Sequence, residues 1–198
     1  MSRVGENDDR HPIVGLVASS TGGVEDIRPQ LVEPLLSMGY RVAVTLTPTA
    51  ATWLDAIGET GRIEAVTGYP VRHAPRLPSE DSPHPDVDCY AVAPASANTV
   101  AKLALGIADN QALAQVCEAI GERRRPVIVF PRVNAAHAGH PAWAAHIATL
   151  QSAAVHLVYG DDAWPLLSPR SAPGRELPWT AVLEAITAEL RGSRSPGE

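Results

Sequence analysis

The segment 94–99 carries side chains that suit a small-molecule binding loop. It follows the apolar run 89–93, which is typical of a buried strand, and precedes an apolar helical pattern over 100–105. In open α/β sheets, ligands bind in the crevice at the carboxyl ends of the strands. Free N–H groups at the start of the following helix attract anions or polar ring edges there. The sequence therefore predicts a binding loop at this strand end.

Four residues of this loop are the expected contacts: Ser96, Ala97, Asn98 and Thr99. The small alanine lets a flat ligand approach the backbone, and the hydroxyl and amide groups can both donate and accept hydrogen bonds. The alternative is structural, because Asn98 or Thr99 could instead cap the helix that follows.

A second polar turn, 19–23, follows the apolar run 13–18. The first strand-to-helix turn of a doubly wound sheet is the usual phosphate position, because N–H groups and the helix dipole converge there. The expected contacts are Ser20, Gly22, Gly23 and Val24. The G-x-G-x-x-G fingerprint is absent, which favours a mononucleotide over a nicotinamide dinucleotide.

Apolar runs and helical patterns alternate along the chain, which predicts an α/β fold with a mostly parallel sheet covered by helices. Strands are expected at 13–18, 41–47, 63–66, 89–93, 127–130 and 155–158, and helices at 27–38, 50–57, 103–120, 142–151 and 179–190. We expect Pro34 to weaken or kink the first helix. The ends of the chain, 1–11 and 191–198, are polar and are expected to be disordered around a domain at 12–190.

Composition excludes several classes of protein. The chain has 198 residues, of which 45% are hydrophobic, so one sizeable core and one domain are expected. The net charge is −6 and the one dense basic cluster is 123–125, which argues against a nucleic-acid surface. No run is long and apolar enough for a membrane span, so we expect a cytoplasmic protein. Cys89 and Cys117 have no metal or disulfide spacing and are expected to be core thiols, so no metal is expected.

The segments 94–99 and 106–110 resemble the signature of the flavin-dependent cysteine decarboxylases, of the phosphopantothenoylcysteine and lantibiotic peptide decarboxylase type. Weaker matches extend the resemblance over about 12–164. It implies a single three-layer, doubly wound Rossmann-like (flavodoxin-like) domain that binds FMN. It also implies a homo-oligomer, either a trimer or a multiple of trimers such as a dodecamer.

The resemblance also assigns a candidate acid/base and further flavin contacts. The segment 69–73 is similar to the family's Asp-Pro-Val-Leu-His segment, which makes His73 the candidate acid/base. Histidine suits that role because its ordinary pKa lies near neutrality. The link after His73 is long, so His84 is the alternative. Thr47 and Thr49 match positions of further flavin contacts, although either could be an ordinary turn residue.

Two departures from the family concern the substrate. The segment 131–138 matches the family's P-x-M-N-x-x-M-W motif only at Pro131 and Asn134, which leaves Asn134 as the expected substrate anchor. The segment 168–177 lacks the cysteine that phosphopantothenoylcysteine decarboxylases carry in their flap. An oxidative decarboxylation does not need that thiol.

The resemblance implies oxidative decarboxylation of a cysteinyl carboxylate, in a small molecule or at a peptide carboxyl terminus. The alternatives are another flavin reaction, such as flavin prenylation, or a flavin-binding subunit without catalysis.

Overall fold

The structure is a computed structural model that describes residues 11–192. The expected disordered leader lies outside the described residues except for His11. The expected tail lies outside them except for residues 191 and 192, which extend the last helix.

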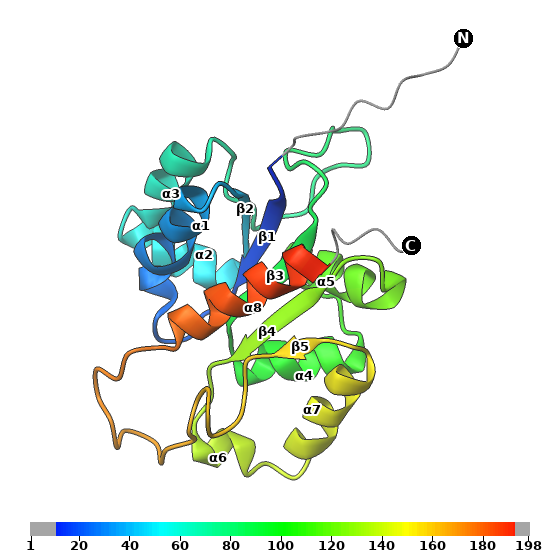
Figure 1. Cartoon of the computed structure of the whole chain (residues 1–198). Helices are drawn as coiled ribbons and strands as arrows, with labels where there is room; N and C mark the ends of the chain where they lie inside the picture. Colours follow the sequence, from blue (N-terminus) through cyan, green and yellow to red (C-terminus); the bar gives the residue numbers. More distant parts are fainter. Residues whose placement is uncertain (1–10, 193–198) are drawn as a thin grey trace.

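The core of the fold is a parallel sheet with the strand order β2-β1-β3-β4-β5 (Figure 1). The strands are β1 (Ile13–Ala18), β2 (Arg41–Leu46), β3 (Cys89–Ala95), β4 (Val127–Pro131) and β5 (His156–Leu157). Every pairing in the sheet is parallel, which confirms the predicted topology. The strand order reverses between β1 and β3, so the topological switch point lies at their carboxyl ends.

Helices cover both faces of the sheet and complete three layers. One face carries η1 (Val24–Asp26), η2 (Arg28–Val32), α1 (Glu33–Ser37) and α8 (Trp179–Gly192), and its core also takes in side chains of α2 (Pro48–Ala56) and α3 (Glu59–Thr67). The other face carries α4 (Ala97–Leu105), α5 (Gln111–Glu122) and α7 (Trp143–Ser152), and α6 (Ala135–Ala138) follows β4. The expected α/β fold with a single three-layer domain is confirmed.

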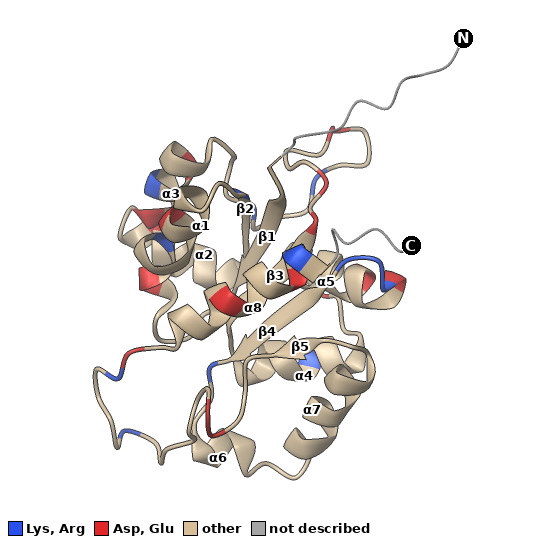
Figure 2. Ribbon diagram, in the orientation of Figure 1, with Lys and Arg blue, Asp and Glu red and all other residues tan. Residues whose placement is uncertain are grey.

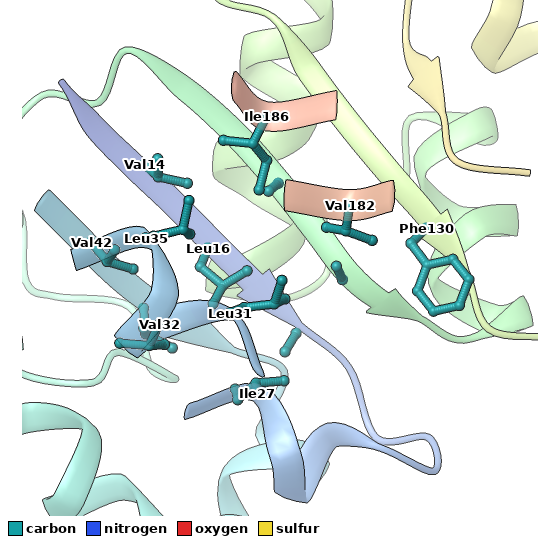
Figure 3. Close-up of a cluster of buried hydrophobic side chains, with 14 of the residues drawn as sticks. Val14, Leu16, Ile27, Leu31, Val32, Leu35, Val42, Phe130, Val182 and Ile186 are labelled. Atoms are coloured by element: carbon teal, nitrogen blue, oxygen red, sulfur yellow. The ribbon is translucent and has the colours of Figure 1, made fainter. Parts of the chain in front are cut away.

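Both faces of the central strands are buried because their side chains alternate between two hydrophobic clusters. Val14 and Leu16 of β1 point toward Leu31 and Leu35, while α8 brings Ile186 onto the same face (Figure 3). Val17, the residue after Leu16, belongs to the cluster on the opposite face. Nearly continuous apolar runs are the consequence, which is why these strands could be recognised in the sequence.

The first helical segment is irregular, as expected from the presence of Pro34. Between η1 and α1 the chain forms a π-helical turn in which the N–H of Glu33 donates to the carbonyl of Arg28. Since Pro34 has no N–H, it cannot donate to an earlier carbonyl in the usual pattern.

Two expected elements differ from the structure. The strand predicted at 63–66 is wrong, because these residues lie in α3, a helix bounded by Gly58 and Gly68 at φ of 72° each. Ile63 is buried while Val66 is exposed, so only one apolar residue of the pair faces the core. The helical region predicted over 103–120 is broken, since Gly106 ends α4 and the Oδ1 of Asn110 accepts the N–H of Leu113 to begin α5.

Charged residues lie mainly in the helices and loops around the sheet, and few lie in the strands (Figure 2). Cys89 is fully buried, and burial raises the pKa of its thiol to about 12, whereas Cys117 is half-buried. Among residues 11–192, no helix combines the length and apolarity needed to cross a bilayer. The same residues contain no group of three or more His, Cys, Asp or Glu side chains placed to hold a metal ion.

Candidate functional site at the carboxyl edge of the sheet

Ser19 joins the two loops at the switch point. Its hydroxyl donates to the carbonyl oxygen of Pro94 at 3.0 Å and accepts the N–H of Ser96 at 2.7 Å. The side chain is 1% exposed, so these bonds are shielded from water. They fix the turn after β1 against the loop after β3. The sequence predicts this turn, but Ser19 is not among the contacts predicted there. The position of Ser19 directly after a buried strand is the feature that could have indicated its role.

The loop after β3 is organised as a helix cap. The Oγ of Ser96 accepts the N–H of Thr99 at 3.2 Å, so Ser96 is the cap of α4, and the prediction that Asn98 or Thr99 caps it is wrong. Thr99 is 2% exposed and its hydroxyl lies 3.1 Å from that of Ser96. Asn98 is exposed, and the first N–H groups of α4 have no partner within the helix. Asn98 and the N–H groups of Ala97 and Asn98 are therefore the groups of this loop best placed for a ligand.

The turn after β1 already holds a carboxylate. The N–H of Gly23 donates to Oε2 of Glu25 at 2.9 Å, in the place predicted for a phosphate. Val24 is buried in the core and its N–H donates to the carbonyl of Thr21, so its side chain is not available to a ligand. Gly22 is exposed beside the turn. An anion bound here would replace the carboxylate of Glu25.

The loop before α8 lies on this turn. Gly23 has φ of 95°, and a Cβ built on it would stand 2.2 Å from Cδ1 of Leu177. Only glycine fits both the backbone angle and the contact. A cavity of about 880 Å³ lies between the turn and this loop, and Arg132 also lines it.

Two buried polar side-chain atoms of the described residues have no hydrogen-bond partner, Oγ1 of Thr47 and Nε of Arg132. Thr47 occupies the N-cap position of α2 directly after β2, without a capping hydrogen bond from its side chain, and Arg132 directly follows β4, so both lie at the carboxyl edge of the sheet. Unpartnered buried polar atoms are costly unless a ligand or water satisfies them. Thr49, in the first turn of α2, is exposed.

The structure separates the two candidate histidines. Arg72 pairs with β2, because its N–H donates to the carbonyl of Val44 and its carbonyl accepts the N–H of Leu46. The next residue, His73, therefore lies at the carboxyl edge of the sheet, and it is exposed. His84 instead lies over the face of the sheet, where it lines a cavity of about 450 Å³ together with Gly15. Its Nε2 is 2.7 Å from the carbonyl of Pro70, and burial lowers its pKa. Only His73 lies at the edge that carries the other predicted residues.

Asn134 caps the short helix α6. Its Oδ1 accepts the N–H of His137 at 3.0 Å, and its Nδ2 forms no hydrogen bond with any other residue in the described range 11–192. The side chain thus serves a structural role and still keeps donors for a substrate. Trp143 is buried and donates to the hydroxyl of Tyr159, so it belongs to the core.

The sequence matches the family model described as Flavoprotein over residues 1–191. The chain belongs to the Flavoprotein family. This match confirms the resemblance on which the predicted cofactor rests.

Solved structures of FMN-dependent cysteine decarboxylases share the fold of this chain. The chain is 23% identical to the FMN-dependent cysteine decarboxylase SpaF, covering 94% of this chain and 98% of that one, with a TM-score of 0.61. For TvaF, an FMN-dependent cysteine decarboxylase from thioviridamide biosynthesis, the identity is 22%, the coverage 93% and 99%, and the TM-score 0.65.

The curated relatives are longer proteins. The chain is 28% identical over 182 residues to the coenzyme A biosynthesis bifunctional protein CoaBC of Escherichia coli K12, covering 88% of this chain and 43% of that protein. It is 38% identical over 71 residues to a cysteine/cysteine sulfinic acid decarboxylase of an unknown prokaryotic organism, covering 36% of this chain and 19% of the relative. The chain therefore spans less than half the length of either relative.

Proposed function

We propose that this flavoprotein binds FMN at the carboxyl edge of the sheet and oxidatively decarboxylates a cysteinyl carboxylate. The observation that carries the proposal is the link through Ser19, which holds the turn after β1 and the loop after β3 together at the switch point. The similarity in structure to SpaF and TvaF, both FMN-dependent cysteine decarboxylases, supports the choice of reaction.

The residues at this edge fit a flavin mononucleotide. The proposed contacts are Ser20, Gly22, Gly23, the backbone of Val24, Thr47, Thr49, Ser96, Ala97, Asn98 and Thr99. The unpartnered hydroxyl of Thr47 would gain a partner, and the N–H of Gly23 already accommodates an anionic oxygen. Thr99, which is buried, would act by orienting the hydroxyl of Ser96. FMN would supply the two-electron oxidation of the cysteinyl side chain to a thioaldehyde, whose sulfur stabilises the carbanion left when CO₂ departs.

His73 and Asn134 would handle the substrate. His73 lies at the carboxyl edge, where its imidazole would accept or return the proton that the thiol loses on oxidation. The free Nδ2 of Asn134 would donate to the substrate carboxylate or to a neighbouring amide. A neutral amide orients that carboxylate without holding its charge as strongly as a cation would.

A homo-oligomer in the cytoplasm completes the proposal. His73 and Asn98 are both exposed in the single chain, so a neighbouring copy would be needed to exclude water from a flavin between them. Light scattering should give a mass that is a multiple of three chains. A monomer that holds FMN tightly would argue against a shared site.

The second candidate is a flavin-binding subunit without this chemistry, or one with another flavin reaction. The replacement of Met and Trp in the segment 131–138 and the absence of cysteine from 168–177 favour it.

The deciding experiment follows the bound flavin. The purified protein should be yellow and release FMN on denaturation, and under anaerobic conditions a phosphopantothenoyl-cysteine or a Cys-terminated peptide should bleach the flavin and release CO₂. A colourless protein that does not take up added FMN would contradict the whole proposal. A yellow protein that neither substrate bleaches would leave the second candidate.

A further inference from the structure

A small cavity beside Asn134 is lined by three arginines. It has a volume of about 200 Å³, and Arg132, Arg170 and Arg175 lie in its wall together with Ser168. None of the residues that line it is acidic. Three cations converge on one space without a lining carboxylate to balance them.

Trp164 holds two of these cations in place. The guanidinium carbon of Arg175 lies 3.5 Å from the centre of the indole ring, and that of Arg132 lies 5.3 Å from it. The ring is fixed in turn, because its Nε1 donates to the carbonyl of Val133 at 3.1 Å and it forms a T-shaped contact with the ring of Phe130. Cation–π contact orients an arginine but leaves most of its N–H donors free. The two guanidinium groups are therefore preorganised for another ligand.

No carboxylate contacts Arg132 or Arg175 directly within residues 11–192, although Glu25, Asp26 and Glu176 line the larger cavity that both arginines also border. Neither residue forms an ion pair in the described chain, and the Nε of Arg132 is one of the two buried polar atoms without a partner. Burial lowers the pKa of Arg132, the charge of Arg175 lowers it further, and the charge of Glu25 opposes both with a smaller effect. A bound anion would relieve the repulsion and satisfy the orphaned donor.

We propose that Arg132 and Arg175 form a subsite for a non-reacting oxyanion, a phosphate or a carboxylate, carried by the substrate. That the anion belongs to the substrate rests on the proposed function, whereas the binding of an oxyanion does not. The arginines do not suit the carboxylate that leaves, because its charge disappears in the transition state. A guanidinium there would stabilise the bound substrate more than the transition state.

The phosphate of FMN is the competing source of the same chemistry. Nη2 of Arg132 would lie 3.6 Å from a Cβ on Gly22, so this arginine is close to the turn proposed for the cofactor. Arg175 lines both the small cavity and the larger one at that turn, whereas Asn134 lines the small cavity and not the larger one. The test must therefore be made with FMN both present and absent.

Calorimetric titration with inorganic phosphate, and separately with acetate, tests the subsite directly. Phosphate or acetate should bind the FMN-loaded protein, and Arg132→Gln and Arg175→Gln should each weaken binding by about ten- to a hundredfold, the loss expected for charged hydrogen bonds. The affinity of the two variants for FMN should equal that of the wild type. The matched control is Arg41→Gln, because Arg41 also lies 5.3 Å from an aromatic ring, that of Tyr69, but outside the cavity.

Unchanged anion affinity in both variants, or release of the anion when FMN is added, would overturn the subsite. Circular dichroism checks that the variants fold. If Arg132→Gln unfolds the protein, Arg175→Gln still tests the subsite, because Arg175 lies in a loop. If the protein binds no FMN, the proposed function fails while the titrations still report on the arginines. The last measurement uses an N-acylated cysteine with a free carboxylate, with and without a terminal phosphate on the acyl group. Both variants should raise KM for the phosphorylated form alone, and equal KM changes for both forms would contradict a substrate subsite.

Discussion

Replacing Gly23 by alanine tests the closure of the loop before α8 over the turn after β1. Two separate costs arise at this position. The backbone has φ of 95°, which an L side chain rarely adopts, and the new Cβ would stand 2.2 Å from Cδ1 of Leu177. Because Leu177 belongs to the loop, the second cost exists only when the loop lies on the turn.

The magnitude follows from matched glycines. Gly58 also has a positive φ, 72°, but nothing lies within 4 Å of its Cβ position, so Gly58→Ala should cost only the conformational term, about 1–2 kcal/mol. Gly23→Ala adds overpacking against Leu177, about 1–3 kcal/mol more, for a total of about 2–5 kcal/mol. Gly121 lies within α5 with open space around it, so Gly121→Ala should be neutral or stabilising by up to about 1 kcal/mol.

Urea unfolding followed by circular dichroism measures these differences. In a Leu177→Ala background the cost of Gly23→Ala should fall to that of Gly58→Ala, and proteolysis within 168–177 should be faster in Gly23→Ala than in the wild type. A coupling energy between positions 23 and 177 below about 0.5 kcal/mol would refute the contact and with it the closed loop.

The other predictions concern catalysis, a buried ion pair and a thiol. His73→Asn should keep the flavin spectrum and the oligomer but lower turnover by about 10²–10⁴-fold, whereas His84→Asn should do much less, as steady-state kinetics with a cysteinyl substrate would show. Glu59, 6% exposed, accepts a hydrogen bond from Nε of Arg28 at 2.8 Å, and this contact lowers its pKa. Glu59→Gln should therefore cost about 2–3 kcal/mol at pH 7. The difference should begin to shrink as the pH falls through about 4, where the unfolded carboxylate takes up its proton, and should vanish only below the lowered pKa of the folded form, so urea unfolding at pH 7 and pH 3 should show a smaller difference at pH 3. Cys89, fully buried with a thiol pKa of about 12, should not react with a thiol reagent in the native protein, so a kinetic count of two fast thiols would contradict its burial.

Much of the fold could be predicted because the central strands are buried on both faces. Runs such as 13–18 and 127–130 are nearly continuous in apolar residues, and the polar turns that follow them mark the carboxyl edge. The place of His73 at that edge could not be derived from periodicity. It depends on the pairing of Arg72 beside β2, a single bridge in a segment with little regular structure.

Local patterns failed where a tertiary contact decides the structure. The segment around Ile63 has too few apolar residues to distinguish a helix from a strand, and the outcome was set by the two glycines that bound α3 and by packing on the core. Trp164 was missed as a site residue because its contacts with Arg132 and Val133 join parts of the chain about 30 residues apart. No spacing rule relates such residues.

The two halves of the carboxyl edge differ in charge, and this difference bears on the substrate. Around Ser19 and Ser96 the available groups are hydroxyls, an amide and backbone N–H donors, which suit the neutral ring and the ribityl chain of a flavin. FMN carries one phosphate, and in the proposed site this group would take the N–H of Gly23 in place of the carboxylate of Glu25. With the phosphate in that place, the cations around Trp164 would exceed what the cofactor requires. If the proposed function holds, the negative charge that balances them must arrive with the substrate, and an uncharged cysteinyl compound should bind less tightly than an anionic one of the same size.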